Sequence, residues 1–506
     1  QASGATSYGI YFGTAATPPF VVTNTGIANT TYTPSALNNS TTYYWQVNSS
    51  NAGGTTTGIV WSFTTAAEIV GNVYVGNAGG NSPTASGVTL ADTPGSGYAT
   101  VTFNLSQQNP FGNVSFDGIA FSDYIWVFVK YSTTSGTDGS WNQAILASGG
   151  SVQPTSDNLG AFVRASLAGA SGNTFTLRWN YNGSGGNGVG AFNAGTFQVR
   201  VFVIEMVDVP TGAYYYDAGG IGTTSYNNFG GTTQTLVNST TQIPTDAASG
   251  WPNGYTSFYL AKYEVSQQQY CDFLNNIPSA TAASTFYAVA NYNQYGYLIA
   301  NTGTYPNQYW TAAPNRACNY LSWADTVAYL SWAALRPMTE MEFEKAARGT
   351  SGGTNTRTYP WGDTAPSVTT GTVDGGTHVI YNANYYVAGI TQVPILVGWY
   401  LGQNYVTNPG GATGIAYTGA SPYGIADLAG NNWEHLINCA WATVPLNGNG
   451  TITAPASWPT AASGKGLRGG SWSSSATSLQ VSDRSYAGWA DTDRNGGIGF
   501  RPARTK

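Results

Sequence analysis

Charged side chains are scarce in this chain. They make up 8% of its 506 residues, against roughly 25% in average soluble proteins. The 17 Lys and Arg and the 23 Asp and Glu give a net charge of −6, and no long block of like charge occurs. Nucleic-acid sites need clustered cations to neutralise phosphates, and so do helices that lie on anionic membranes. The composition therefore argues against both, and we expect no nucleic-acid partner.

The shortage of lysine and arginine also leaves strand edges without their usual protection. With so few charges, the polar surface must consist of Ser, Thr, Asn, Gln, Gly and Tyr. Two interpretations fit this composition. One is a secreted protein with a neutral and glycosylated surface, and the other is a subunit that packs against copies of itself.

Long apolar runs, a leader peptide and an even set of cysteines are also missing. The longest apolar runs, 124–129 and 199–209, have the length of strands, and a membrane span needs roughly 18 residues. No signal peptide opens the chain, and Gln1 begins within a domain, so we expect processing or a longer precursor. The odd count of three cysteines leaves at least one thiol unpaired or paired between chains: Cys271, Cys318 and Cys439. With the small polar residues, this favours an extracellular or cell-surface location.

The length predicts about three domains, and the first two have the alternating pattern of β-strands. In residues 1–66, the segments YYWQVNSSNAGG (43–54) and WSFTT (61–65) resemble the closing strands of bacterial fibronectin type III modules. The first two strands of such a module are absent, so the sandwich would have open edges and an exposed core. The missing strands are cleaved yet bound, or a neighbour supplies them, or the segment is a remnant. We expect head-to-tail assembly with a strand donated at residues 1–66.

Residues 67–203 read as a second antiparallel sandwich, with strand-like segments at 99–106, 124–133, 174–182 and 196–206. The glycine run NGSGGNGVG (182–190) lacks the ending of a phosphate loop and is interpreted as a long turn.

Helices appear only in residues 204–506. A hydroxyl followed three residues later by an acid or amide is a capping box. It predicts helices that begin at Ser266, Ser322 and Thr339, the last ending at Gly349. We expect Trp323, Val327 and Leu330 to lie on one helical face in the core.

Six motifs in this part resemble, in order, the formylglycine-generating-enzyme/sulfatase-modifying domain, whose fold is related to C-type lectins. They cover 258–275, 319–349, 359–363 (YPWGD), 424–435 (GIADLAGNNWEH), 467–472 (LRGGSW) and 497–504 (GIGFRPAR). The expected fold class is therefore multidomain, with two all-β sandwich modules followed by an α+β domain of this family.

The resemblance also indicates what is missing. Ser474 and Leu479 stand where the catalytic cysteines of the family belong. Relatives that use iron need a histidine cluster, and His378 and His435 are the only histidines. We therefore expect neither copper nor iron, and no conversion of cysteine to formylglycine. Lectin-like relatives bind ligands with a variable surface, which corresponds here to 473–479 and 487–495. The predicted ligand contacts are Trp472, Ser473, Ser475 and Trp489.

Calcium is the cofactor that the resemblance implies. The stretch GNNWE (430–434) keeps the form that supplies a structural calcium site in the family, with Asn431 and Glu434 in place and Asn384 as a second candidate. The alternative is that Glu434 is a buried carboxylate bonded to backbone amides. The family has an aromatic residue where His435 stands. Asp491, Asp493 and Asn495 begin like a calcium loop, but Pro502 stands where its closing glutamate belongs, which favours a tight turn.

The preferred function is a non-enzymatic extracellular structural or adhesive protein, a self-assembling surface or filament subunit. One alternative is a display protein that binds a glycan or other ligand with its C-terminal lectin-like face. Another is an enzyme of unrecognised chemistry on the same scaffold.

Overall fold

A computed structural model provides the structure of the protein. It describes residues 4–24, 31–32, 34, 41–64, 84–106, 114–116, 119–136, 139, 141–164, 173–193, 195–216, 235–245, 247–287, 294–301, 308–349, 357–362, 365–401, 415–460, 463–489 and 494–506. None of the helices in these ranges is both long enough and apolar enough to cross a membrane.

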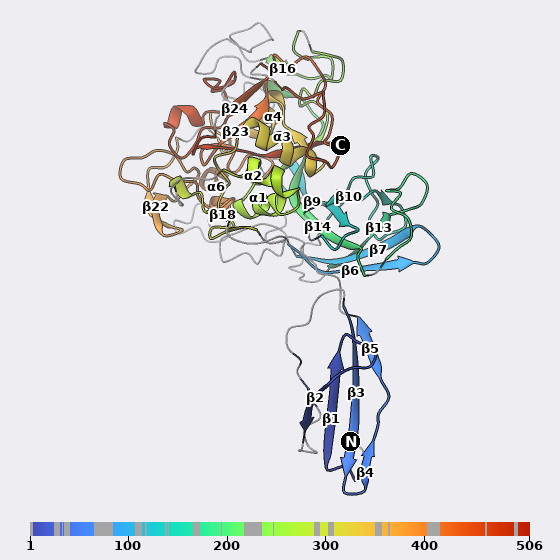
Figure 1. Ribbon diagram of the computed structural model, residues 1–506. Helices are drawn as coiled ribbons and strands as arrows, with labels where there is room; N and C mark the ends of the chain where they lie inside the picture. The colour runs from blue at the N-terminus through green and yellow to red at the C-terminus, as the bar shows by residue number, and fades with distance from the viewer. Residues whose placement is uncertain are drawn as a thin grey trace.

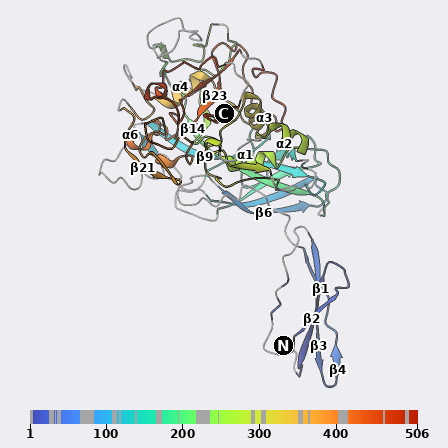
Figure 2. The same ribbon diagram turned by 60° about the vertical axis from the view of Figure 1, so that its left-hand side comes forward.

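The first 64 residues contribute one antiparallel sheet of five strands. In this sheet β2 (Phe20–Asn24), β1 (Ser7–Gly13), β3 (Thr42–Asn51) and β4 (Gly54–Thr56) follow one another, and β5 (Trp61–Thr64) also pairs with β3. In Figures 1 and 2 this sheet lies apart from the other described strands. The described residues form no second layer over it, so the complete two-layer fibronectin arrangement is not seen here.

The second part is a two-layer β-sandwich, as its alternating pattern predicts. One layer has the strand order β11 (Leu146–Ala147), β13 (Asn173–Asn180), β7 (Tyr98–Ser106) and β6 (Thr84–Thr93). The other layer is centred on the long pair β9 (Ile119–Ser132) and β14 (Gln198–Val209), with β8 (Val114–Phe116), β10 (Asn142–Gln143) and β12 (Ala161–Val163) paired to β9. The inward residues of both layers, such as Val101, Trp179 and Val201, form one buried core.

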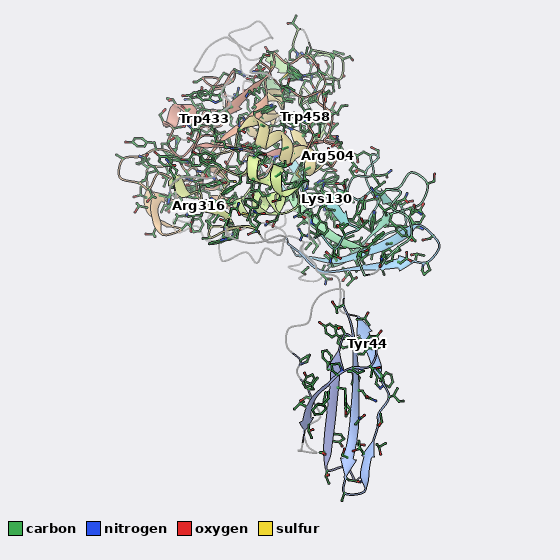
Figure 3. The ribbon with its side chains drawn as sticks, viewed as in Figure 1. Tyr44, Lys130, Arg316, Trp433, Trp458 and Arg504 are labelled. Carbon is green, nitrogen blue, oxygen red and sulfur yellow. The ribbon has the colours of Figure 1, made fainter. Side chains whose placement is uncertain are left out.

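The second layer continues into the C-terminal part of the chain. Strand β14 pairs with β17 (Phe258–Ala261), which pairs with β26 (Pro502–Thr505) and then β20 (Arg336–Pro337). The domain boundary expected between residues 203 and 204 therefore lies inside β14. Lys130 on β9 strengthens the junction, since its buried Nζ donates to the carbonyl oxygens of Trp332 and Gly450 at 2.6 and 2.7 Å (Figure 3).

The three predicted helices are confirmed, each with its capping box. They are α1 (Gln267–Leu274), α3 (Trp323–Trp332) and α4 (Glu340–Arg348), and Gly349 ends α4 in a left-handed conformation (φ 80°). On α3, Trp323 and Leu330 are buried and Val327 packs against the same core. Two short helices, α2 (Ser279–Thr285) and α6 (Ile415–Thr418), were not predicted, and α2 has no side-chain cap.

The remaining described strands form small sheets. Three are hairpins: β15 (Tyr214–Tyr216) with β16 (Thr235–Val237), β18 (Ile299–Asn301) with β19 (Tyr309–Thr311), and β21 (Thr370–Val373) with β22 (Gly376–Val379). The fourth sheet has the order β24 (Lys465–Arg468), β23 (Trp433–Ile437) and β25 (Ile498–Phe500). This three-stranded sheet carries the candidate site.

Candidate ligand-binding pocket

The pocket begins at one end of the three-stranded sheet. Trp433 is opposite Ile498 in the parallel pair of β23 and β25, and Leu467 on β24 is opposite His435. Trp433, Leu467 and Ile498 are buried together, and Trp489 packs against them. This apolar cluster gives the pocket a firm base (Figure 3, Trp433).

Two glycines turn the chain from β24 into the serine-rich loop that follows. Gly469 and Gly470 have φ values of +95° and +77°. A Cβ on Gly470 would lie 2.9 Å from Leu479 Cδ1 and 3.0 Å from the Ser478 carbonyl oxygen. The loop therefore folds tightly over its own short 3-10 turn, Ala476–Leu479.

Hydroxyl groups are bonded to one another across this loop. Ser471 Oγ lies 3.1 Å from Ser473 Oγ and 3.1 Å from Ser474 Oγ. The Ser471 amide donates to Ser474 Oγ at 2.9 Å, and Ser475 Oγ lies 2.7 Å from Thr477 Oγ1. Because these bonds fix the loop, its hydroxyls form an ordered polar wall.

A pocket of about 370 Å³ opens between this wall and a group of aromatic rings. Its lining is Trp433, Leu467, Ser471, Ser473, Ser474, Ser475, Ser478, Tyr486, Trp489, Asn495, Gly497 and Ile498. Tyr486 meets Trp433 and Trp489 edge-to-face, with ring centroids 4.8 and 5.1 Å apart. No carboxylate, imidazole, amine or thiol occurs among these described lining residues.

The four predicted ligand contacts do not all lie in this pocket. Ser473, Ser475 and Trp489 line it. Trp472 is buried instead: its ring packs against Tyr295 at 5.2 Å, and its Nε1 donates to the Gly496 carbonyl at 3.0 Å. Trp472 therefore supports the loop and does not line the pocket. Tyr486 and Trp433 were missed, although the aromatic rings beside the variable segment were a usable signal.

The two positions at which we expect the family's cysteines, 474 and 479, have different environments. Ser474 lies in the pocket wall. Leu479 is buried and packs in a separate core with Tyr359, Trp361 and Tyr385. A side chain at position 479 therefore supports the loop from within, while one at position 474 reaches the pocket.

The neighbourhood of the predicted calcium ligands is rich in buried carboxylates. Both carboxylate oxygens of Glu434 accept from Arg501 Nε at 3.1 Å, and Arg501 Nη2 donates at 2.7 Å. Glu434 is thus a buried carboxylate, but its partner is a guanidinium and not the backbone amides of the alternative. Asn431 bonds to Glu264 and also accepts from the Ile395 amide at 2.9 Å. The packing needs Gly430, since a Cβ there would lie 2.4 Å from the Asn384 carbonyl oxygen.

Glu264 and Asp427, which sequence reasoning missed, belong to the same cluster. Burial, with Glu434 and Asp427 nearby, raises the pKa of Glu264 well above its usual range. Burial also raises the pKa of Asp427 to about 6 against the opposing effects of the Gly398 amide and Arg501. Three buried carboxylates thus share one guanidinium. In the described residues, no three His, Cys, Asp or Glu side chains are arranged to hold a metal.

The remaining predicted metal ligands, Asn384, Asn495, Asp491 and Asp493, do not lie together in one site of the described structure. Asn384 Oδ1 is buried and has no hydrogen-bond partner among the described residues, while its Nδ2 donates to the Val393 carbonyl at 2.9 Å. Asn495 lines the pocket and accepts from the Gly497 amide at 2.9 Å. Asp491 and Asp493 lie outside the described residues.

The histidines and cysteines do not form a site together. His435 is buried, its ring meets Trp323 edge-to-face at 5.7 Å, and its Nε2 lies 3.1 Å from the Leu321 carbonyl oxygen. It fills the place of the family's aromatic residue and adds a hydrogen bond. His378 is buried on β22. Cys271, Cys318 and Cys439 are all buried and form no disulfide among the described residues.

Comparison with known proteins identifies the same family as the six motifs. Residues 198–506 match the family of the sulfatase-modifying factor enzyme 1-like domain. A formylglycine-generating enzyme of Mus musculus is 27% identical over 244 residues, which cover 42% of this chain and 57% of that protein. One from Thermomonospora curvata is 32% identical over 142 residues, or 26% of this chain and 39% of that protein.

A hercynine oxygenase of Mycolicibacterium thermoresistibile is 28% identical over 182 residues, which cover 34% of this chain and 33% of that protein. The chain thus spans between about a third and little more than half of the length of these relatives. The family match covers more than half of the chain and includes the sheet, the loop and the pocket described above. This protein therefore belongs to the family of the sulfatase-modifying factor enzyme 1-like domain.

Proposed function

We propose that the pocket beside the serine loop binds a neutral, polyhydroxylated ligand, and that its natural ligand is a carbohydrate. The observation that carries this proposal is the combination of ordered hydroxyls with aromatic rings in one open pocket without a charged side chain among its described lining residues. Its volume of about 370 Å³ lies within the usual range of small-molecule sites.

Sugars match both walls of the pocket. A pyranose ring has C–H faces that pack on aromatic rings, and its hydroxyls can donate to and accept from serine hydroxyls and the Asn495 amide. A phosphate ligand is disfavoured, because no Lys or Arg lines the described pocket.

We also propose that this family member does not oxidise cysteine. Thiolates are the nucleophiles and soft-metal ligands of such chemistry. The serine at position 474 and the buried leucine at position 479 supply neither. In this proposal the domain has kept the family scaffold as a binding surface, in an extracellular adhesive or structural role.

Binding can be tested with the complete chain on an array of neutral oligosaccharides, followed by calorimetric titration of the best binder. Tyr486→Ala and Trp489→Ala are each expected to weaken binding at least about tenfold, since aromatic anchors dominate such contacts. Tyr417→Ala is the matched control, because Tyr417 and Tyr486 are equally exposed, at 39% and 38%, and Tyr417 lies outside the pocket. The proposal fails if no neutral glycan binds, or if the control loses as much affinity.

A second experiment addresses the enzymatic alternative. The chain is incubated with copper, oxygen and a peptide that carries a sulfatase motif. We expect no aldehyde product, and a formylglycine detected by mass spectrometry would show that the domain is an enzyme.

We propose calcium as a structural cofactor of the same domain. Three buried carboxylates share Arg501 (Glu264, Asp427 and Glu434), and Asn384 Oδ1 and Asn432 Oδ1 are buried oxygens without a hydrogen-bond partner in the described residues. Hard oxygen ligands and an excess of negative charge suit Ca²⁺. The described residues contain no ready group of three acidic ligands, so Asn384 and at most two of these carboxylates would hold it, and the ion's role would be to stabilise the fold.

A further inference from the structure

One face of the N-terminal sheet carries mainly apolar and aromatic side chains. Residues that are directly paired in an antiparallel sheet lie on the same face. Ile10 pairs with Val47 and Val22, Phe12 pairs with Trp45, Trp45 pairs with Trp61, and Tyr43 pairs with Phe63. We call these eight residues the apolar face. The opposite face is mixed, since Gln46, Asn48 and Ser62 lie there beside Tyr11, Phe20 and Tyr44.

The side chains of the apolar face are already packed against one another. Phe12 stacks on Tyr43 with centroids 5.1 Å apart, Tyr43 on Phe63 at 5.9 Å, and Trp45 on Trp61 at 6.4 Å. Ile10 and Tyr43 are buried, and the ring of Tyr32 lies 6.0 Å from that of Phe12, but Trp61 is 57% exposed, Phe63 41%, Val22 41% and Trp45 39%. An antiparallel sheet with one apolar and one polar face normally buries the apolar one. This face is therefore an interaction surface.

The lack of charged residues in the N-terminal sheet limits which kind of surface can bind to the apolar face. Residues 1–67 contain no Asp, Glu, Lys, Arg or His. A charged surface that docked on this face would lose its hydration without gaining an opposite charge, which is costly. The partner surface must therefore be neutral and apolar.

The chain itself offers one such surface. Among the described residues, 16 large hydrophobic side chains are exposed, and eight of them lie between Phe20 and Phe63, of which Val22, Trp45, Trp61 and Phe63 belong to the apolar face. The other eight are scattered from Leu236 to Tyr486 in sequence. The matching neutral and apolar area is thus the same sheet on another copy, which it meets without like-charge repulsion.

We propose that two copies of the protein pack their apolar faces against each other and form a two-layer β-sandwich between chains. The contact is isologous, so it closes after two copies. The four strands have 7, 5, 10 and 4 residues, and at about 3.4 Å per residue and about 4.8 Å spacing they give about 420 Å² on each copy. The total of about 850 Å² is below the usual size of a stable interface, so the dimer is expected to be weak and reversible.

This closed contact differs from the head-to-tail strand donation that the sequence suggests, and the two have different products. Face-to-face packing gives a dimer, whereas strand donation gives polymers of increasing length. Sedimentation velocity of the complete chain from about 1 µM to about 100 µM separates them, since reversible dimers dissociate in this range of concentration. We expect a monomer–dimer equilibrium. A chain that stays monomeric, or one that forms an open series of polymers, would overturn the proposal.

Two variants in one strand test the face itself. Trp61→Arg places a charge on the apolar face and is expected to raise the dimer Kd at least about tenfold. Ser62→Arg adds the same charge to the adjacent residue, which faces the other way beside Tyr44, and should leave the Kd unchanged. Circular dichroism confirms folding, and Phe63→Thr is a milder second variant. Equal effects of Trp61→Arg and Ser62→Arg would refute the assignment of the face.

Discussion

The hydroxyl oxygens of Ser471 and Ser474 lie 3.1 Å apart, and the Ser471 amide also donates to Ser474 Oγ at 2.9 Å. The position at which we expect the family's first cysteine thus carries a hydroxyl that belongs to an ordered polar wall. A serine becomes a nucleophile when an adjacent base takes its proton. No imidazole or carboxylate is among the described residues that line the pocket, so none of these residues offers Ser474 such a base.

The different environments of positions 474 and 479 can be measured with a thiol reagent. In the native protein Cys271, Cys318 and Cys439 are buried, and burial raises the pKa of each thiol well above its usual range. They should therefore react slowly. Ser474→Cys is expected to add one fast-reacting thiol under native conditions, and Leu479→Cys none. Fast labelling of the Leu479→Cys variant would contradict the buried position of that residue.

His435 is expected to make the protein sensitive to acid. Burial lowers the pKa of its imidazole to about 4, opposed by the Leu321 carbonyl. The unfolded chain then binds more protons than the folded one between about pH 6.5 and about pH 4, so stability falls as the pH falls through this window. The expected loss is about 3 kcal/mol.

His435→Phe should lose this pH dependence, although it also loses the hydrogen bond to Leu321. Denaturant titrations at a series of pH values measure the slope. Trp323→Leu is the control, because it removes the ring contact and keeps the imidazole, so its stability should fall by a similar amount at every pH. A slope that persists in His435→Phe would show that other groups cause the acid sensitivity.

Asp272 on α1 is expected to give the folding stability the opposite pH dependence to that of His435. Burial raises the pKa of its carboxyl to about 7, against the effects of Gln268 and Arg200. The folded chain then binds more protons than the unfolded one, so stability falls as the pH rises from about 4 to about 7.

At pH 8, Asp272→Asn should be more stable than the wild type by about 1–3 kcal/mol, and at pH 4 the two should be alike. Asp157→Asn is the contrasting variant. Burial alone would raise the pKa of Asp157, but Arg504 and Thr155 hold it below its usual range, so this change should destabilise at pH 8. If the two variants respond alike to pH, the difference in their environments is not the cause.

Local signals made the helices and the family readable from the sequence. The capping boxes at Ser266, Ser322 and Thr339 are complete within four residues, so they predicted helix starts that the structure confirms. The six ordered motifs likewise identified the domain that residues 198–506 match.

Features that depend on long-range pairing could not be read in this way. Strand β14 joins the sandwich to the C-terminal domain because β9 and β17 pair with its two edges, and no local pattern encodes both partners. Arg501 meets Glu434 across 67 positions, and Glu264 joins them from a third segment. A reading of one motif at a time therefore found Glu434 and missed the charges that surround it.

The buried charge of the carboxylate cluster around Arg501 predicts that calcium stabilises the protein. Since Glu264, Asp427 and Glu434 share Arg501 as a buried counter-charge, a bound Ca²⁺ would offset the remaining negative charge. Calcium should raise the melting temperature of the complete chain, with a gain of about 2.7 kcal/mol at a hundredfold excess over its Kd. The effect should be larger at pH 8 than at pH 5, because the pKa of Asp427 is raised to about 6.

Asp427→Asn and Glu264→Gln should abolish the calcium effect and, in chelator, be at least as stable as the wild type, since each removes a repulsive charge. Asp374→Asn, at a partly exposed carboxylate paired with Arg316, should keep the full effect. A melting temperature that chelation leaves unchanged, with no metal by elemental analysis, would refute the calcium site, and a calcium effect that survives both cluster variants would place the ion elsewhere.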